Sequence, residues 1–306
     1  MAKKNQKNDN LPEGMSRRQA KLAARAAERA ALEKEARPYG GLGAEADLVA
    51  LQEFVPSAVA KVAVNGIDRD VYVVTVLPGG SAALVREESD GGAGFVALQT
   101  ASQSQSPGRD LAYALTWLKD AQPGQTLESA VADGSQPALT ELIDADAALE
   151  ITEHQDFNWW IPESVELDQV TGQALQAAND SVVESHRVDT EIPGAVWWVN
   201  PGGGKAHIRW IRPEDNEDAL LNALARVAAR GELNLGEGTK FAGVFRTHGI
   251  IVPVFDLDPS VAADSYGAEL TRVSGLVDTE IANDAQLTAD ERKQLQNIKS
   301  RQVTIR

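Results

Sequence analysis

Short apolar runs alternate with turn residues through the first half of the chain after residue 37. Four runs have the length and Val-rich composition of strands and lie at residues 58–64, 71–77, 82–86 and 94–100. The turns between them contain Asn-Gly, Pro-Gly-Gly and Asp-Gly-Gly, which supply positive backbone φ angles. Helical spacing of apolar residues predicts helices at 44–54 and 109–119.

The pattern is clearer in the second half. Strand-like runs at 195–199 and 206–211 predict a hairpin, and 241–246 with 250–255 predict another, around Thr247-His248-Gly249. Between them a helix is predicted to begin at Pro213 and end at Gly231. The order is therefore β-β-α-β-β.

Weaker patterns predict the remaining elements. Helices are expected at 137–143, 164–179 and 288–299, and short strands at 149–152 and 157–161. The pairs Trp159-Trp160 and Trp197-Trp198 would then each place one ring on either side of a sheet. The run Gly202-Gly203-Gly204-Lys205 lies between strands, which favours a hairpin turn over a phosphate loop.

These elements predict an α+β fold with antiparallel sheets, helices packed on one face, and two lobes that could be related by duplication. The helices predicted at 109–119 and 213–231 have similar amino-acid sequences, which is the reason for considering duplication. Five segments are expected: a basic arm (1–37), a first lobe (38–162), a helical connector (163–192), a second lobe (193–262), and a C-terminal tail with an exposed helix (263–306).

The arm differs from the rest of the chain in charge. Residues 1–37 hold ten Lys and Arg against five Asp and Glu, a net charge of +5, whereas the whole chain has a net charge of −16. After a polar start, Ser16 and Gln19 form a capping-box pattern that opens an Ala-rich helix. Four cations at a spacing of four form one stripe on this helix: Arg17, Lys21, Arg25 and Arg29. The Gly-rich segment 38–43 is expected to be a hinge.

The stripe has several interpretations. It could bind the phosphates of RNA or of the ribosome, without base specificity because the arm has no aromatic residues. It could equally be a solvated helix that pairs with the acidic body of the same chain, or bind an acidic protein. Attachment to an anionic membrane surface is disfavoured because the helix lacks anchoring Trp and Phe residues.

Composition limits the possible chemistry. The chain has no cysteine, which excludes thiolate nucleophiles and Cys-based metal sites. Its four His residues are scattered singly, so no metal site and no cofactor are expected. A signal-peptide pattern and an apolar run long enough to cross a membrane are both missing from the sequence, and the cytoplasm is the expected location.

One set of residues could form a binding pocket or an active site. If the two hairpins are neighbours, they could bring together two Arg, two His and one Asp: His207, Arg209, Arg246, His248 and Asp256. Such a set would suit a phosphate or nucleotide-like anion. No catalytic residue is assigned by any motif.

Three blocks resemble an uncharacterised actinobacterial family: Pro38 to Leu42, residues 50–56, and residues 236–257 from Gly236 to Leu257. Some members of that family begin with a zinc-binding SEC-C motif. Because this chain has no cysteine, the zinc site is not expected here. The resemblance implies an interaction module at the position where this chain has its basic arm.

The sequence as a whole predicts a non-enzymatic accessory protein that docks to the ribosome or RNA through its arm. The alternatives are a small-molecule binder or enzyme that uses the hairpin pocket, and a protein–protein adaptor that uses the acidic body.

Overall fold

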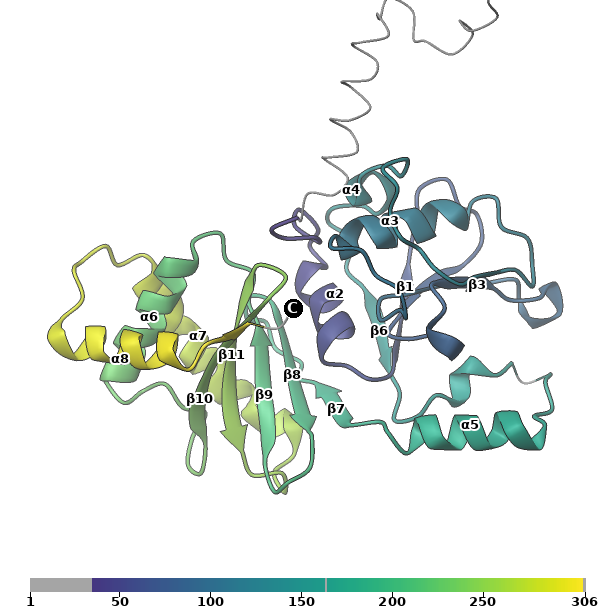
Figure 1. The fold of residues 1–306 in the computed structure, drawn as a ribbon. Coiled ribbons are helices and arrows are strands. Elements are labelled where there is room, and N and C mark those ends of the chain that lie inside the picture. Colours follow the sequence, from purple (N-terminus) through teal and green to yellow (C-terminus); the bar gives the residue numbers. More distant parts are fainter. Residues whose placement is uncertain (1–34, 163, 305–306) are drawn as a thin grey trace, which may run out of the picture.

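A computed structural model describes residues 35–162 and 164–304 of the chain. Its strands form two sheets of six strands each, one in each of two lobes that lie side by side (Figure 1). Most neighbouring strands are antiparallel, and the exceptions are β2–β4 and β10–β12. The predicted α+β class with mostly antiparallel sheets is confirmed. The predicted arm helix with its cationic stripe lies outside the described residues.

The first sheet has the strand order β5-β3-β4-β2-β1-β6. Its lobe consists of α2 (Glu45–Glu53), β1 (Ala58–Val62), β2 (Val71–Val74), β3 (Ala83–Val85), β4 (Gly94–Ala97), α3 (Pro107–Trp117), β5 (Thr126–Leu127), α4 (Leu139–Leu142) and β6 (Glu150–Glu153). The helix α2 ends before Pro56, as the sequence predicts.

The second sheet has the order β12-β10-β11-β9-β8-β7. Its lobe consists of β7 (Glu184–Arg187), β8 (Ala195–Asn200), β9 (Ala206–Ile211), α6 (Glu217–Ala229), β10 (Lys240–Thr247), β11 (Ile250–Leu257), α7 (Gly267–Ile281), α8 (Ala289–Ser300) and β12 (Val303–Thr304). Both predicted hairpins are present, with Gly202 to Gly204 at positive φ in the first turn.

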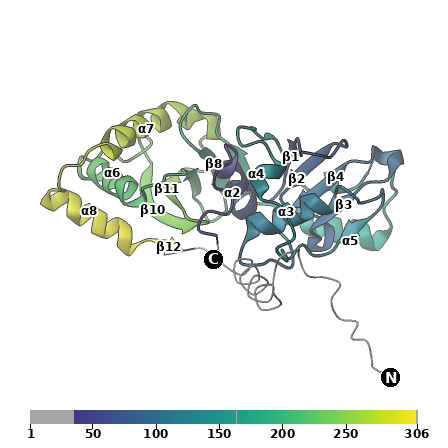
Figure 2. The ribbon, with the colours of Figure 1, turned by 90° about the horizontal axis from the view of Figure 1, so that it is seen from above.

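One hydrophobic core contains residues of both lobes. Leu48 and Leu51 of α2 belong to the same buried cluster as Trp197 of β8 and Val252 of β11. Figures 1 and 2 both place α2 between the two sheets, with α6, α7 and α8 on the far side of the second sheet. The second sheet is thus covered on both faces. Trp197 lies in the core next to α2 and Trp198 in the core under α6 and α7, which confirms the prediction that this pair places one ring on either side of a sheet.

The segment 263–304 is an integral part of the second lobe and not a tail. Leu270, Val273 and Val277 of α7 are buried in the core that α7 shares with α6 and the sheet. The helix α8 matches the predicted exposed helix, with Ile298 as its buried residue. The segment 163–192 contains the predicted helix, α5 (Gln169–Asn179). It also contains a strand that was not predicted, β7, which belongs to the second sheet.

Two further predictions are wrong. Trp159 and Trp160 lie in a 3-10 turn and not in a strand, because both indole N–H groups are held there, by Ser57 Oγ at 2.9 Å and the Val76 carbonyl at 3.0 Å. The segment 38–43 is no hinge, because Tyr39 and Leu42 are only 1% and 5% exposed.

The strand arrangements of the two sheets support the predicted duplication only in part. In each, a hairpin lies beside a second antiparallel pair, β1–β2 beside β3–β4 and β8–β9 beside β10–β11. The contact between the pairs is parallel in the first sheet and antiparallel in the second. An α-helix separates the pairs in the second lobe, whereas a short 3-10 helix at Pro78–Gly80 lies between them in the first.

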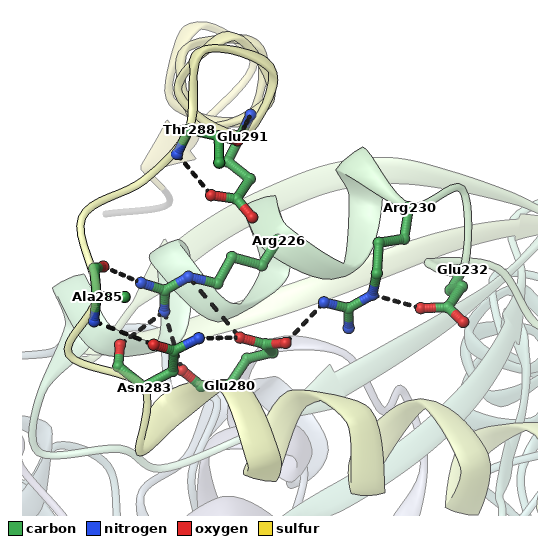
Figure 3. A network of polar contacts seen from close by, with 8 residues as sticks. All are labelled: Arg226, Arg230, Glu232, Glu280, Asn283, Ala285, Thr288 and Glu291. Atoms are coloured by element: carbon green, nitrogen blue, oxygen red, sulfur yellow. Dashed lines mark hydrogen bonds and ion pairs between the residues drawn. The ribbon is translucent and has the colours of Figure 1, made fainter.

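A buried arginine joins α6 to the end of α7. Arg226 is 4% exposed, and its guanidinium donates to the backbone carbonyls of Glu280, Asn283 and Ala285 (Figure 3). Carbonyls in the last turn of a helix lack partners within the helix, and Arg226 donates to one of them, Glu280, and to two more in the segment that follows α7. Arg230 extends the network with a 2.6 Å contact to Glu280.

Among the described residues, no helix has the length and apolar character needed to cross a membrane.

Candidate functional site: a cleft between the lobes

A cleft of about 640 Å³ lies where the two lobes meet. The first lobe contributes the end of α2 with Gln52 and Glu53 and the loop at 103–107, and the second contributes the turn between β10 and β11. Residues 35–38 are here called the strap, and three of them, Glu35, Ala36 and Pro38, form a further part of the lining. Clefts of this size at domain boundaries are common ligand sites.

The backbone of the strap lies very close to a glycine of each lobe. A Cβ atom added to Gly108 of α3 would lie 2.0 Å from the Pro38 carbonyl oxygen, and one added to Gly249 would lie 2.1 Å from the Ala36 carbonyl oxygen. A side chain at either glycine would therefore collide with the strap backbone. One glycine comes from each lobe, so the strap is held from both sides.

Ion pairs fix the strap in the same position. Glu35 lies 3.1 Å from Arg109 of the first lobe. Arg37 contacts Glu45 at the start of α2, and its other terminal nitrogen lies 2.6 Å from Asp215 of the second lobe. The residues that enter the body after the arm are thus bound to both lobes.

His248 connects the lobes on the other side of the strap. It has a φ of +47° and is followed by Gly249 with a φ of +74°, a combination typical of the two-residue hairpin turn that favours Asn-Gly. Its Nε2 lies 2.7 Å from a carboxylate oxygen of Glu53, and these side chains are 14% and 19% exposed. The sequence prediction that the hairpin turns around Thr247-His248-Gly249 is confirmed.

Tyr39 and Gln52 form a buried contact beneath the cleft. The Tyr39 hydroxyl donates to Oε1 of Gln52 at 2.5 Å. Burial raises the pKa of the Tyr39 phenol far above its ordinary value, and the nearby carboxylates of Glu53, Asp110 and Glu35 act in the same direction. The phenol is therefore a neutral donor that fixes the orientation of the Gln52 amide.

Arg246 has capacity for a further partner. One terminal nitrogen contacts Glu217 at the start of α6, and the buried Nε has no hydrogen-bond partner in the part of the chain that the structure describes. The other terminal nitrogen has no partner among the described residues, and Arg246 lines the cleft.

The five residues of the predicted hairpin pocket do not share one site. His207 and Asp256 face each other across β9 and β11, with 3.2 Å between Nδ1 and the carboxylate. Arg209 lies on the same face, 5.1 Å from the Phe54 ring centre. Arg246 pairs with Ile251, so strand alternation places it on the opposite face. His248 lies at the far end of β11 from Asp256, about 20 Å away at ~3.3 Å per residue.

The residues that do meet have electrostatics consistent with a surface ion pair. Burial lowers the pKa of His207, although Asp256 opposes the shift. Burial would raise the pKa of Asp256, but Lys205 at 2.7 Å and His207 hold it below its usual value. Burial alone lowers the pKa of Arg209. The convergent pocket required for the enzyme alternative is therefore not formed.

Sequence reasoning did not find Gln52, Glu53 or the strap as site residues. The family resemblance points to the same region, because its three blocks contain Pro38, then Gln52 and Glu53, then residues 246–249, and all of these residues line the cleft. Within the two described ranges, no group of three or more His, Asp or Glu side chains is placed to hold a metal ion.

Comparison with known proteins gives one match. The family DUF5926, described as a family of unknown function, matches residues 38–306. The chain belongs to this family. The DUF5926 match begins inside the strap and covers both lobes, whereas the basic arm precedes it. No curated protein and no solved structure matches the chain.

Proposed function

We propose that this DUF5926 protein is a cytoplasmic, non-enzymatic accessory protein that docks to the ribosome or to RNA through residues 1–34. The observation that carries the proposal is the reversal of charge at the strap. Residues 1–34 hold nine Lys and Arg against four Asp and Glu, a net charge of +5, and the remainder of the chain has a net charge of −21. Phosphate would be attracted to the arm and repelled by the body.

The strap gives this arrangement a physical basis. Because both lobes hold residues 35–38, the arm starts from a fixed point on the body. A partner bound by the arm would keep the body close, and the acidic surface would limit contact to the arm itself. The cations expected to meet phosphate are Arg17, Lys21, Arg25 and Arg29.

The resemblance adds support of a different kind. We expect relatives in actinobacteria, some with a SEC-C zinc motif in place of the arm. An interaction module at that position would fit a docking role for the N-terminal segment.

Co-sedimentation with ribosomes tests the proposal. A variant with Glu at positions 17, 21, 25 and 29 should lose co-sedimentation at low salt. The control variant carries four Lys→Glu changes on exposed positions of the body, at Lys61, Lys119, Lys240 and Lys293. It changes the net charge by the same amount and should retain most of the binding.

Equal loss in both variants would mean that net charge alone governs the association, which would contradict docking by the arm. If wild type does not sediment with ribosomes or bind mixed RNA, the RNA proposal fails. An acidic protein partner would then be sought by crosslinking from position 21.

A further inference from the structure

We propose that the cleft between the lobes binds a short peptide with free termini. This inference is independent of RNA docking and rests on hydrogen-bonding groups in the cleft that have no partner among residues 35–162 and 164–304.

Gln52 and Gln103 both line the cleft and together offer a donor and an acceptor to a peptide bond. Gln52 is 8% exposed, and its Oε1 accepts from Tyr39, which leaves its amide N–H groups without a partner in the described part of the chain. The Nε2 of Gln103 donates to the Leu98 carbonyl at 3.1 Å, which leaves its Oε1 to accept. One fixed donor and one fixed acceptor suit the C=O and N–H of a peptide group.

The charged groups suit the two ends of a peptide. The free terminal nitrogen of Arg246 can donate to a carboxylate. Glu53 uses one carboxylate oxygen for His248, and the other has no hydrogen-bond partner among the described residues and can accept from an ammonium group. A zwitterion would satisfy both residues without adding net charge to the cleft.

Other ligand classes fit less well. A phosphate ester carries a charge near −2 and would meet the carboxylates of Glu35 and Glu53 in the same cleft. A sugar usually stacks on an exposed aromatic ring, but the neighbouring Tyr39 is only 1% exposed. The volume of about 640 Å³ lies within the range of small-ligand sites.

The test uses a tripeptide library of random sequence in four forms: uncapped, N-acetylated, C-amidated and doubly capped. Binding to the full chain is followed by thermal shift and then by calorimetry on the best pool. The uncapped pool should stabilise the protein, and each cap should weaken binding at least about tenfold, as expected for loss of a charged hydrogen bond.

Matched variants assign the termini. Arg246→Gln should remove the preference for a free carboxylate and keep the preference for a free amine, and Glu53→Gln should do the reverse. Gln105→Trp should block the cleft, whereas Gln173→Trp, an equally drastic change on the exposed face of α5, should have no effect on binding.

The inference is overturned if no pool stabilises wild type at millimolar concentration, or if uncapped and doubly capped pools bind equally. It is also overturned if Gln105→Trp binds as well as Gln173→Trp. RNA binding by the arm would be unaffected by any of these results.

Discussion

The carboxylate of Glu53 lies 2.7 Å from Nε2 of His248, although the two residues are 195 positions apart in the chain. Glu53 ends α2 in the first lobe, and His248 forms the tip of a hairpin in the second. A hairpin turn of this kind favours Asn over His on conformational grounds. The His side chain is therefore best explained by its contact with the other lobe.

A substitution that keeps the turn can isolate this contact. His248→Asn should retain the hairpin and lose the link to Glu53, at a cost of about 1 kcal/mol in the free energy of unfolding. The measurement is urea denaturation of His248→Asn, Glu53→Gln and the double variant. A coupling energy below about 0.3 kcal/mol would show that the two side chains do not stabilise each other.

The close approach of the strap to α3 predicts an unusual effect of alanine. Gly108→Ala should destabilise the protein, because the new Cβ would meet the Pro38 carbonyl oxygen at 2.0 Å. Helix propensity alone predicts the opposite, a gain of up to about 1 kcal/mol. Gly275→Ala in α7 is the control, since no atom beyond its chain neighbours and the adjacent backbone of α7 lies within 4 Å of its added Cβ among the described residues, and it should stabilise. Stabilisation by both changes in thermal unfolding would contradict the position of the strap.

The network in Figure 3 predicts a contrast between two arginines. Arg226→Met should cost about 3 kcal/mol, because it removes a buried guanidinium that donates to three backbone carbonyls. Arg230→Met should cost less than about 1 kcal/mol, because its side chain is 40% exposed. Equal costs in chemical denaturation would mean that Arg226 is not the main support for the end of α7.

Two truncations can locate the boundary between arm and body. Removal of residues 1–34 should leave the midpoint of thermal unfolding within about 1 °C. Removal of residues 1–37 should lower it by about 3 °C or more, because it deletes most of the strap and the ion pairs of Arg37 with Glu45 and Asp215. If both truncations have the same midpoint, the strap does not contribute to stability. The sequence alone placed this boundary after residue 37.

The elements that the sequence predicted well have strong local signals. Both hairpins of the second lobe combine alternating apolar residues with Gly-rich or His-Gly turns, and α6 has a clear apolar stripe. The strand β7 was missed because its sequence, Glu184-Ser185-His186-Arg187, is polar. It becomes a strand by pairing with the edge of β8, a contact that the local sequence does not indicate. The helix α7 could have been found from the spacing of Leu270, Val273 and Val277.

The cleft could not be predicted in the same way. It is built from four segments that are distant in the sequence, and its key groups are defined by which hydrogen bonds remain unused. Whether Gln52 presents a donor depends on Tyr39, and no spacing rule connects these residues to Arg246. The expected pocket of five residues failed for a related reason, because strand register decides which side chains share a face.

The salt dependence of RNA binding tests the central claim most directly. Affinity of the full chain for single-stranded RNA of mixed sequence is measured between low and physiological salt. Four phosphate contacts predict a slope of about −3 in a plot of log K against log salt concentration. Binding and slope should both disappear when Arg17, Lys21, Arg25 and Arg29 are replaced by Glu. The claim is contradicted if wild type binds no RNA at low salt, or if the four-Glu variant binds with the same affinity and slope.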